Sequence, residues 1–201
     1  MGKLQTMFAC GVLLLCASSA SAVPRCVTVS AGATIRAPYE VVFDTIVDTD
    51  RYRDWNPYIV KVFPAAVDIT VPGTEFVLVV IQPLSGSVTF AAEIATSVKP
   101  PGDGHAQITY AFNRPLARFL GFPERTQDVT RIGRSETYYE TSETFCGPLI
   151  GLLPLDDVQA GFDAQTAALA AESRRRFRAS HPPCTHSREG KDRSQRGSGA
   201  C

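Results

Sequence analysis

The chain has 201 residues, of which 44% are apolar, and this is enough for one globular domain with a hydrophobic core. Its 20 basic and 20 acidic residues balance overall, but residues 174–201 hold eight of the basic residues and two of the acidic ones. The apolar content argues against a fibrous or wholly disordered protein. Because the body is acidic, any nucleic-acid partner would have to bind the basic tail, and we expect none.

The first 22 residues have the features of a secretory signal peptide. Lys3 gives a short positive region, residues 7–17 are almost wholly apolar, and Ala20-Ser21-Ala22 supplies the small residues of a cleavage site. The apolar run of about 11 residues is too short to span a membrane, which takes about 20. We therefore expect an exported, secreted chain that begins near Val23 and has no membrane span.

Export changes the interpretation of the cysteines. Cys26, Cys146, Cys184 and Cys201 would remain after cleavage, which is an even number in an oxidising compartment. Four cysteines allow three pairings, and the spacing alone does not choose between them.

The mature chain begins with a strand pattern and then becomes helical. Residues 26–37 alternate like a strand, and residues 38–48 carry apolar side chains at helical spacing after an initial proline. Residues 51–55 can form a second short helix, which Pro57 should end.

Period-two alternation then continues for about ninety residues. Turn signals rich in Pro and Gly divide it into six predicted strands, at residues 59–69, 74–82, 87–98, 105–113, 125–132 and 135–145. Because the turns are short, consecutive strands should pair antiparallel. Residues 114–122 interrupt the pattern and are predicted to form a short helix or a flap.

The C-terminal part is predicted to be one long helix followed by a tail. Residues 154–177 are rich in helix formers, with two aspartates in the first turn and three arginines in the last. Residues 181–201 are polar, rich in Pro, Gly and Ser, and without periodicity, so we expect a disordered basic tail. The globular domain should then span residues 23–180.

The order of these elements indicates an α+β fold in which one antiparallel sheet curls around the terminal helix. Five segments resemble the START-like, or SRPBCC, superfamily, in its polyketide cyclase/dehydrase or hydrophobic-ligand-binding branch: APYEVVF (37–43), residues 48–54, WNP (55–57), ETFCG (143–147) and Gly161-Phe162. The resemblance covers most of residues 27–173. It implies a helix-grip fold, in which a seven-stranded sheet wraps a long C-terminal helix, two short helices follow strand one, and an apolar cavity lies between sheet and helix.

The resemblance also implies a cysteine pairing. In a helix-grip sheet the first strand lies antiparallel beside the last, which brings Cys26 near Cys146. A disulfide between these two residues is therefore expected, and Cys184 and Cys201 would pair within the tail or stay labile.

Strand alternation predicts which side chains face the implied cavity. On residues 87–98 the inward face is expected to carry Phe90, with Glu93 on the outer face. Together with the corner after the second helix and the long helix, the predicted ligand contacts are Trp55, Tyr58, Phe90, Ile94, Ile108, Phe112, Thr141 and Phe162.

The candidate catalytic residues are Glu143, Tyr139 and Tyr110. Glu143 and Tyr139 share the inward face of the last strand. A carboxyl group in an apolar lining has a raised pKa and can transfer a proton near neutrality. The two tyrosines would polarise a carbonyl or hold a ligand hydroxyl. In the alternative interpretation, Glu143 is solvated at the strand end or bonded to Thr141 and has no such role.

Other polar residues carry weaker signals. His105 is expected to be a solvated surface histidine, and Arg114 and Arg118 could meet an acidic ligand at the cavity mouth. Residues 181–186 have the spacing H-x-x-C-x-H, but no fourth ligand is close, so we expect no metal site.

The sequence contains no Gly-rich phosphate loop, no nucleophile elbow and no H-E-x-x-H helix, and we predict no cofactor. The first functional hypothesis is an exported binder of a hydrophobic small molecule, such as a lipid, a terpenoid or a polyketide. The second is a cofactor-free cyclase or dehydratase of secondary metabolism that uses the same cavity. A third is a secreted protein that binds a surface through its basic tail. The oligomeric state is not predicted.

Overall fold

The computed structural model describes residues 26–113, 124–147 and 150–181. The expected signal peptide, the predicted helix or flap with Arg114 and Arg118, and the tail with Cys184 and Cys201 lie outside these residues. The elements in chain order are β1 (Cys26–Ile35), α1 (Tyr39–Val47), the 3-10 turn η1 (Thr49–Arg51), α2 (Tyr52–Trp55), β2 (Ile59–Phe63), β3 (Glu75–Ile81), β4 (Val88–Gly102), β5 (His105–Phe112), β6 (Glu124–Gly133), β7 (Glu136–Cys146), the 3-10 turn η2 (Ile150–Leu152) and α4 (Leu155–Ser180).

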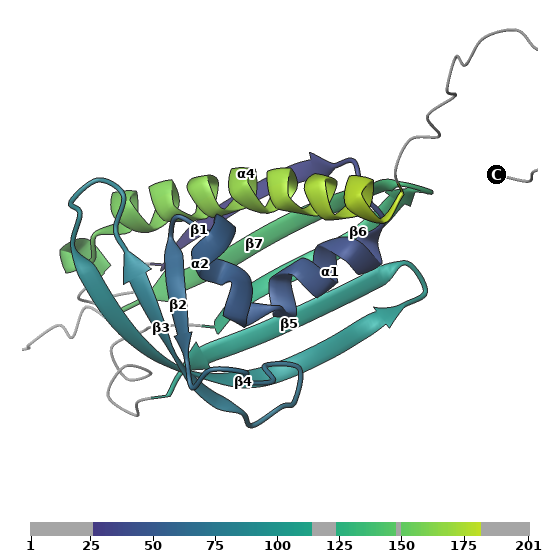
Figure 1. Cartoon of the computed structure of the whole chain (residues 1–201). Coiled ribbons are helices and arrows are strands. Elements are labelled where there is room, and N and C mark those ends of the chain that lie inside the picture. Colours follow the sequence, from purple (N-terminus) through teal and green to yellow (C-terminus); the bar gives the residue numbers. More distant parts are fainter. Residues whose placement is uncertain (1–25, 114–123, 148–149, 182–201) are drawn as a thin grey trace, which may run out of the picture.

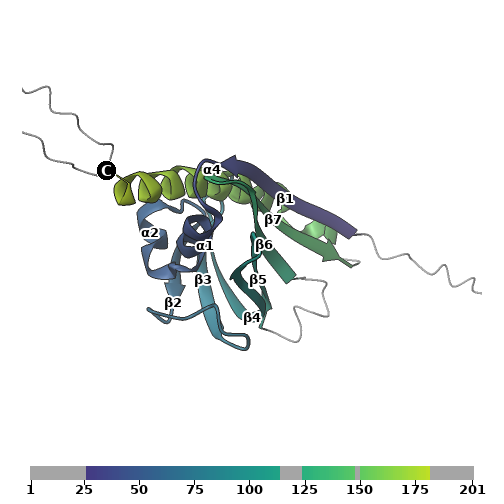
Figure 2. The same ribbon diagram turned by 90° about the vertical axis from the view of Figure 1, so that its right-hand side faces the viewer.

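The seven strands form one antiparallel sheet in the order β1-β7-β6-β5-β4-β3-β2. The sheet curls around α4, which runs along its concave side (Figures 1 and 2). The predicted α+β helix-grip fold is therefore confirmed. The second short helix differs in detail, because a 3-10 turn precedes the four residues of α2. Strand β2 also ends at Phe63, earlier than the sequence pattern predicts.

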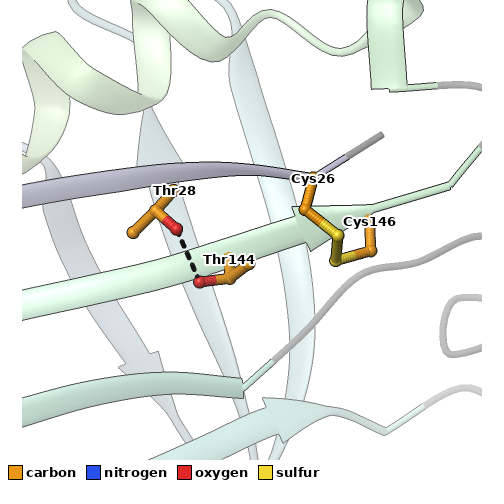
Figure 3. The surroundings of a disulfide bond; sticks show 4 residues. All are labelled: Cys26, Thr28, Thr144 and Cys146. Carbon is orange, nitrogen blue, oxygen red and sulfur yellow. Dashed lines mark hydrogen bonds between the residues drawn. A yellow bond between two sulfur atoms is a disulfide. The ribbon is translucent and has the colours of Figure 1, made fainter. Parts of the chain in front are cut away.

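Cys26 and Cys146 lie directly opposite each other in the ladder between β1 and β7 and form a disulfide (Figure 3). The ladder continues without a shift to the pair Ile35 and Thr137. Beside the disulfide, the exposed hydroxyl groups of Thr28 and Thr144 are hydrogen-bonded at 2.9 Å. The pairing implied by the family resemblance is confirmed, and it fastens the edge strand β1 to the sheet.

The W-N-P tripeptide forms the corner between α2 and β2. The side-chain Oδ1 of Asn56 accepts hydrogen bonds from the backbone N–H groups of Tyr58 and Ile59, each at 3.0 Å. The Asn56 backbone is extended, as expected before a proline. The Trp55 ring packs edge-to-face against Tyr52. This corner fixes the point at which Tyr58 enters the concave side of the sheet.

The two longest helices share the concave side of the sheet. Helix α1 lies between α4 and the sheet and buries Val42, Phe43 and Ile46 there (Figure 2). Helix α4 approaches Tyr58 so closely that a Cβ atom at Gly161 would lie 2.2 Å from the tyrosine ring. Because α1 fills one end of the concave side, space remains at the other end, beside the N-terminal half of α4.

Candidate functional site

A cavity of about 280 Å³ lies between strands β3 to β7 and the N-terminal half of α4. Its volume is close to the lower end of the range for small-molecule pockets, which is about 300 to 1,000 Å³. Most of its wall is apolar or aromatic, formed by Leu78, Val80, Ala91, Phe112, Phe145, Leu153, Val158 and Phe162. The cavity therefore suits the body of a compact apolar molecule.

Three charged residues interrupt the apolar wall. Glu93 on β4, Arg125 on β6 and Glu143 on β7 are 5%, 4% and 8% exposed. In the sheet, Arg125 is directly opposite Glu143 on one side and Tyr110 of β5 on the other. We call Glu93, Tyr110, Arg125 and Glu143 the polar cluster, because all four line the cavity.

The Arg125 guanidinium is held by neutral groups. Its Nε donates a hydrogen bond to Oγ1 of Thr141 at 3.0 Å, and its Nη2 donates to Oε1 of Gln165 at 3.1 Å. The centre of the Phe162 ring lies 4.0 Å from the guanidinium carbon, which adds a cation–π contact. Arg125 forms no salt bridge with any described carboxylate. Its positive charge is therefore not neutralised by a contacting anion within the described protein.

Both carboxyl groups of the polar cluster can change protonation near neutral pH. Burial raises the pKa of Glu143 to about 7, although the charge of Arg125 opposes the increase. Burial also raises the pKa of Glu93 to about 8, and the charge of Glu143 adds to this effect. Because a charge on Glu143 makes the ionisation of Glu93 less favourable, the two protons are lost in two steps that belong to the pair.

Gln127 on β6 connects the polar cluster to the neighbouring elements. Its Nε2 donates to the Tyr110 hydroxyl at 3.2 Å, and its Oε1 accepts a hydrogen bond from the Tyr139 hydroxyl at 2.8 Å. Gln165 of α4 donates to the same Oε1 at 3.4 Å. Among the described residues, the hydroxyl hydrogen of Tyr110 has no acceptor. The network thus orients Tyr110 and leaves it a donor for a ligand in the cavity.

The turn between β3 and β4 borders the cavity and is fastened to α4. Oδ1 of Asp157 accepts hydrogen bonds from the backbone N–H groups of Leu84 and Ser85, at 2.7 and 3.1 Å. Gln82 lines the cavity beside this turn, and its buried Oε1 has no hydrogen-bond partner among the described residues. This end of the cavity therefore offers a second polar contact, an acceptor, to a ligand.

Five of the residues predicted from sequence line the cavity, and they are Tyr58, Tyr110, Phe112, Glu143 and Phe162. Glu143 is buried, and Oγ1 of Thr141 is the acceptor of Arg125. Among the described residues no hydrogen bond joins Glu143 to Thr141, and the alternative interpretation, in which Glu143 has no role in proton transfer, stays a prediction as well. The roles of the five residues in binding or catalysis stay predictions.

The predicted orientation of β4 is wrong. Phe90 is 68% exposed on the outer face and Ile94 is half-buried, whereas Glu93, expected outside, lines the cavity. The strand is apolar on both faces, and Phe90 pairs with Val79, a further apolar residue on the outer face of β3. Alternation of apolar and polar residues therefore could not identify the inner face here.

Four other predicted residues do not line the cavity as the structure describes it. Trp55 packs at the corner of α2, and Ile108 is buried in the core. Tyr139 and Thr141 are buried on the concave face as predicted, but they hold Gln127 and Arg125 instead of bordering the cavity. The physical reason is that α1 occupies part of the concave side, next to β5, β6 and β7.

Three polar cavity residues were not predicted from the sequence, and they are Arg125, Glu93 and Gln82. A signal for Arg125 was present, because Arg125, Gln127 and Val129 alternate on the buried face of β6. The alternation rule, applied to residues 125–132, would have put a charged side chain inside the sheet. No comparable signal distinguishes Gln82, which follows the end of β3.

The weaker candidates lie away from the cavity. His105 is on the outer face, with its Nε2 2.6 Å from Oδ2 of Asp128, so it is paired and half-buried instead of freely solvated. Within the described residues, no three potential metal ligands are grouped together. None of the described helices is long and apolar enough to cross a membrane.

No protein-family model matches the chain, and no curated protein matches its sequence. A solved START superfamily protein from Mycobacterium smegmatis matches its structure with a TM-score of 0.51 and 18% identity, over 76% of this chain and 97% of the other. The chain has a START-like fold. The Zhui aromatase/cyclase from a Streptomyces species matches this START-like fold with a TM-score of 0.54 and 17% identity, over 78% and 99% of the two chains. A major latex-like protein from Panax ginseng matches with a TM-score of 0.56 and 11% identity, over 74% and 97%. At such identities the shared property is the fold, and function has to be argued from the cavity.

Proposed function

We propose that the protein is an exported binder of a hydrophobic small molecule, such as a lipid, a terpenoid or a polyketide, and that it holds this molecule in the cavity. The observation that carries the proposal is an apolar and aromatic wall with one polar cluster in it. Desolvation of apolar surface provides the binding free energy, at about 25 cal/mol per Å². A small number of polar groups, here Arg125 and its neighbours, then orients the ligand.

Export is supported by two independent features. The signal-peptide pattern of residues 1–22 would direct the chain to the secretory pathway. The disulfide between Cys26 and Cys146 is compatible with an oxidising compartment. In a secreting host, the intact mass of the product should correspond to a chain that begins near Val23. An uncleaved product that stays inside the cell would contradict this part of the proposal.

Ligand binding can be tested with anilinonaphthalene sulfonate, a fluorescent probe that apolar molecules displace. Ala91→Trp fills the cavity from the inner face of β4, and Phe90→Ser, at the adjacent exposed position, is the matched control. Wild type and Phe90→Ser should take up the probe, and Ala91→Trp should lose uptake while its circular dichroism stays native. Equal uptake by Ala91→Trp, or no uptake by wild type, would contradict the proposal.

A second candidate function is a cofactor-free cyclase or dehydratase that works in the same cavity. The observation in its favour is that Glu93, Tyr110 and Glu143 line the same cavity, where burial raises the pKa of the two carboxyl groups to about 8 and about 7. Glu143 would transfer a proton, and Tyr110 would donate a hydrogen bond to a carbonyl oxygen. Glu143→Gln keeps the shape and removes the transferable proton. Loss of product formation with retained substrate binding would support this function, and unchanged product formation would exclude the role of Glu143.

A further inference from the structure

Arg125 is a buried cation with unused hydrogen-bonding capacity. A guanidinium has five N–H donors, and the described protein provides acceptors for two of them, Thr141 and Gln165. Glu143, its direct neighbour in the sheet, forms no salt bridge with it. A buried charge that lacks an ionic partner is unfavourable, and an anion in the cavity would remove this cost.

We propose that the ligand is an apolar molecule with one anionic group such as a carboxylate, that this group binds Arg125, and that Glu143 or Glu93 takes up a proton when it does so. The inference rests on the proposed function, because it specifies the ligand of the same cavity. A guanidinium binds a carboxylate through two charge-assisted hydrogen bonds, which are among the strongest in proteins. The body of the ligand would then lie along the aromatic wall that includes Phe162 and Phe112.

Proton uptake follows from the charges around the bound anion. The anion would enter a space that Glu93 and Glu143 border. The negative charge of the anion and that of an ionised glutamate would repel each other at this short range. Protonation of a glutamate relieves the repulsion and leaves Arg125 paired with the ligand. This protonation is accessible because the pKa values of Glu143 and Glu93 are already raised to about 7 and about 8. The affinity for an anion should therefore rise as the pH falls.

The other titratable groups that face the polar cluster keep their charge state between about pH 6.5 and about pH 8.5, the range in which the two glutamates ionise. Burial raises the pKa of Tyr58 to about 12, and it raises the pKa of Tyr110 well above its usual value. Behind the cluster, burial also raises the pKa of Tyr139 to about 12 and increases that of Tyr52. On α4, burial opposes the charge of Asp157, but hydrogen bonds from the β3–β4 turn lower its pKa. Strand β1 faces Glu143 with Val29, which does not titrate.

The test compares decanoate with decan-1-ol, which have the same chain length and differ in charge. Isothermal titration calorimetry in buffers of different ionisation enthalpy measures both the affinity and the number of protons taken up. Decanoate should bind with uptake of up to about one proton, and its affinity should rise about tenfold from about pH 8.5 to about pH 6.5. Decan-1-ol should bind with no proton uptake and no dependence on pH.

Three variants identify the groups involved. The double variant Glu93→Gln/Glu143→Gln should lose proton uptake and bring decanoate affinity at about pH 8.5 close to the wild-type affinity at about pH 6.5, because neither carboxyl group can then carry a charge. Glu140→Gln, on the exposed outer face of the same strand, should behave as wild type. Arg125→Met should lose the binding of decanoate and keep that of decan-1-ol, provided that its thermal unfolding stays cooperative. If Arg125→Met does not fold, the two glutamate variants still decide the inference.

The outcomes separate this inference from the function on which it rests. Binding of decan-1-ol together with pH-independent or absent binding of decanoate would overturn the inference and leave the cavity binder intact. Proton uptake by the double variant Glu93→Gln/Glu143→Gln equal to that of wild type would overturn the role of the two carboxyl groups. Failure of both probes to bind wild type would count against the proposed function, and the inference would fall with it.

Discussion

Glu143→Gln should make the folded protein more stable at neutral and alkaline pH. Burial raises the pKa of Glu143 from 4.5 to about 7 in the folded state, so the folded protein binds this proton more tightly than the unfolded chain does. The contribution to stability is therefore fully present below about pH 4.5, decreases as the pH rises, and is lost above about pH 7. Glutamine cannot ionise, so the variant avoids this loss.

The structure gives the size of the effect. A shift from 4.5 to about 7, at about 1.4 kcal/mol for each pKa unit, corresponds to about 3 kcal/mol. The free energy of unfolding of the variant should exceed that of wild type by this order of magnitude at about pH 8.5. The difference should approach zero at about pH 4. Urea unfolding at several pH values measures both limits.

Glu140→Gln is the matched control, because Glu140 is exposed on the outer face of the same strand. Its free energy of unfolding should differ from that of wild type by a small amount that does not follow the same pH dependence. If Glu143→Gln has the same pH dependence as wild type, or is less stable than wild type at about pH 8.5, burial does not disfavour the charge of Glu143. The argument for proton transfer and for proton uptake in the cavity would then lose its basis.

Three further changes test the elements that support the cavity. Gly161→Ala would bring a Cβ atom to 2.2 Å from the Tyr58 ring, so it should cost about 1 to 3 kcal/mol of stability and weaken probe binding. An unfolding midpoint equal to that of wild type would contradict this close packing. Replacement of both Cys26 and Cys146 by Ser opens a loop with a sequence separation of 120, and should lower the free energy of unfolding in urea by about 4 kcal/mol. An unfolding midpoint unchanged from that of oxidised wild type would argue against the disulfide. Asp157→Ala removes the acceptor of the Leu84 and Ser85 amides, so these should exchange hydrogen faster, and retained protection of both would show that another group holds the turn.

The sequence was informative on β7, where the end of the strand contrasts an apolar residue inside, Phe145, with a polar residue outside, Thr144. Tyr139, Thr141 and Glu143 alternate in step with Phe145 and face the concave side as the pattern predicts, although the outer face carries a tyrosine and a glutamate too. The cysteine pairing followed from strand order, which the resemblance to the START-like superfamily supplied. The first result depends on the periodicity of a strand, and the second depends on the topology of the sheet.

The sequence was misleading where that contrast is missing. On β4 the outer residues Val88 and Phe90 are more apolar than the inner residues Thr89 and Glu93, so hydrophobicity favours the wrong face. A cavity wall can carry charged groups that the protein holds through other side chains, as Thr141 and Gln165 hold Arg125. Such groups come from separate elements of the chain, and their contacts become visible when the fold brings the elements together.

The central claim is that the cavity holds a hydrophobic small molecule. The most direct measurement is native mass spectrometry of the purified wild-type protein and of Ala91→Trp, followed by organic extraction and identification of any released compound. We predict an added mass of an apolar compound on wild type, lost on denaturation, and no added mass on the cavity-filled variant. Equal added mass on both proteins, or a ligand-free wild type that also takes up no apolar compound supplied to it, would contradict the claim.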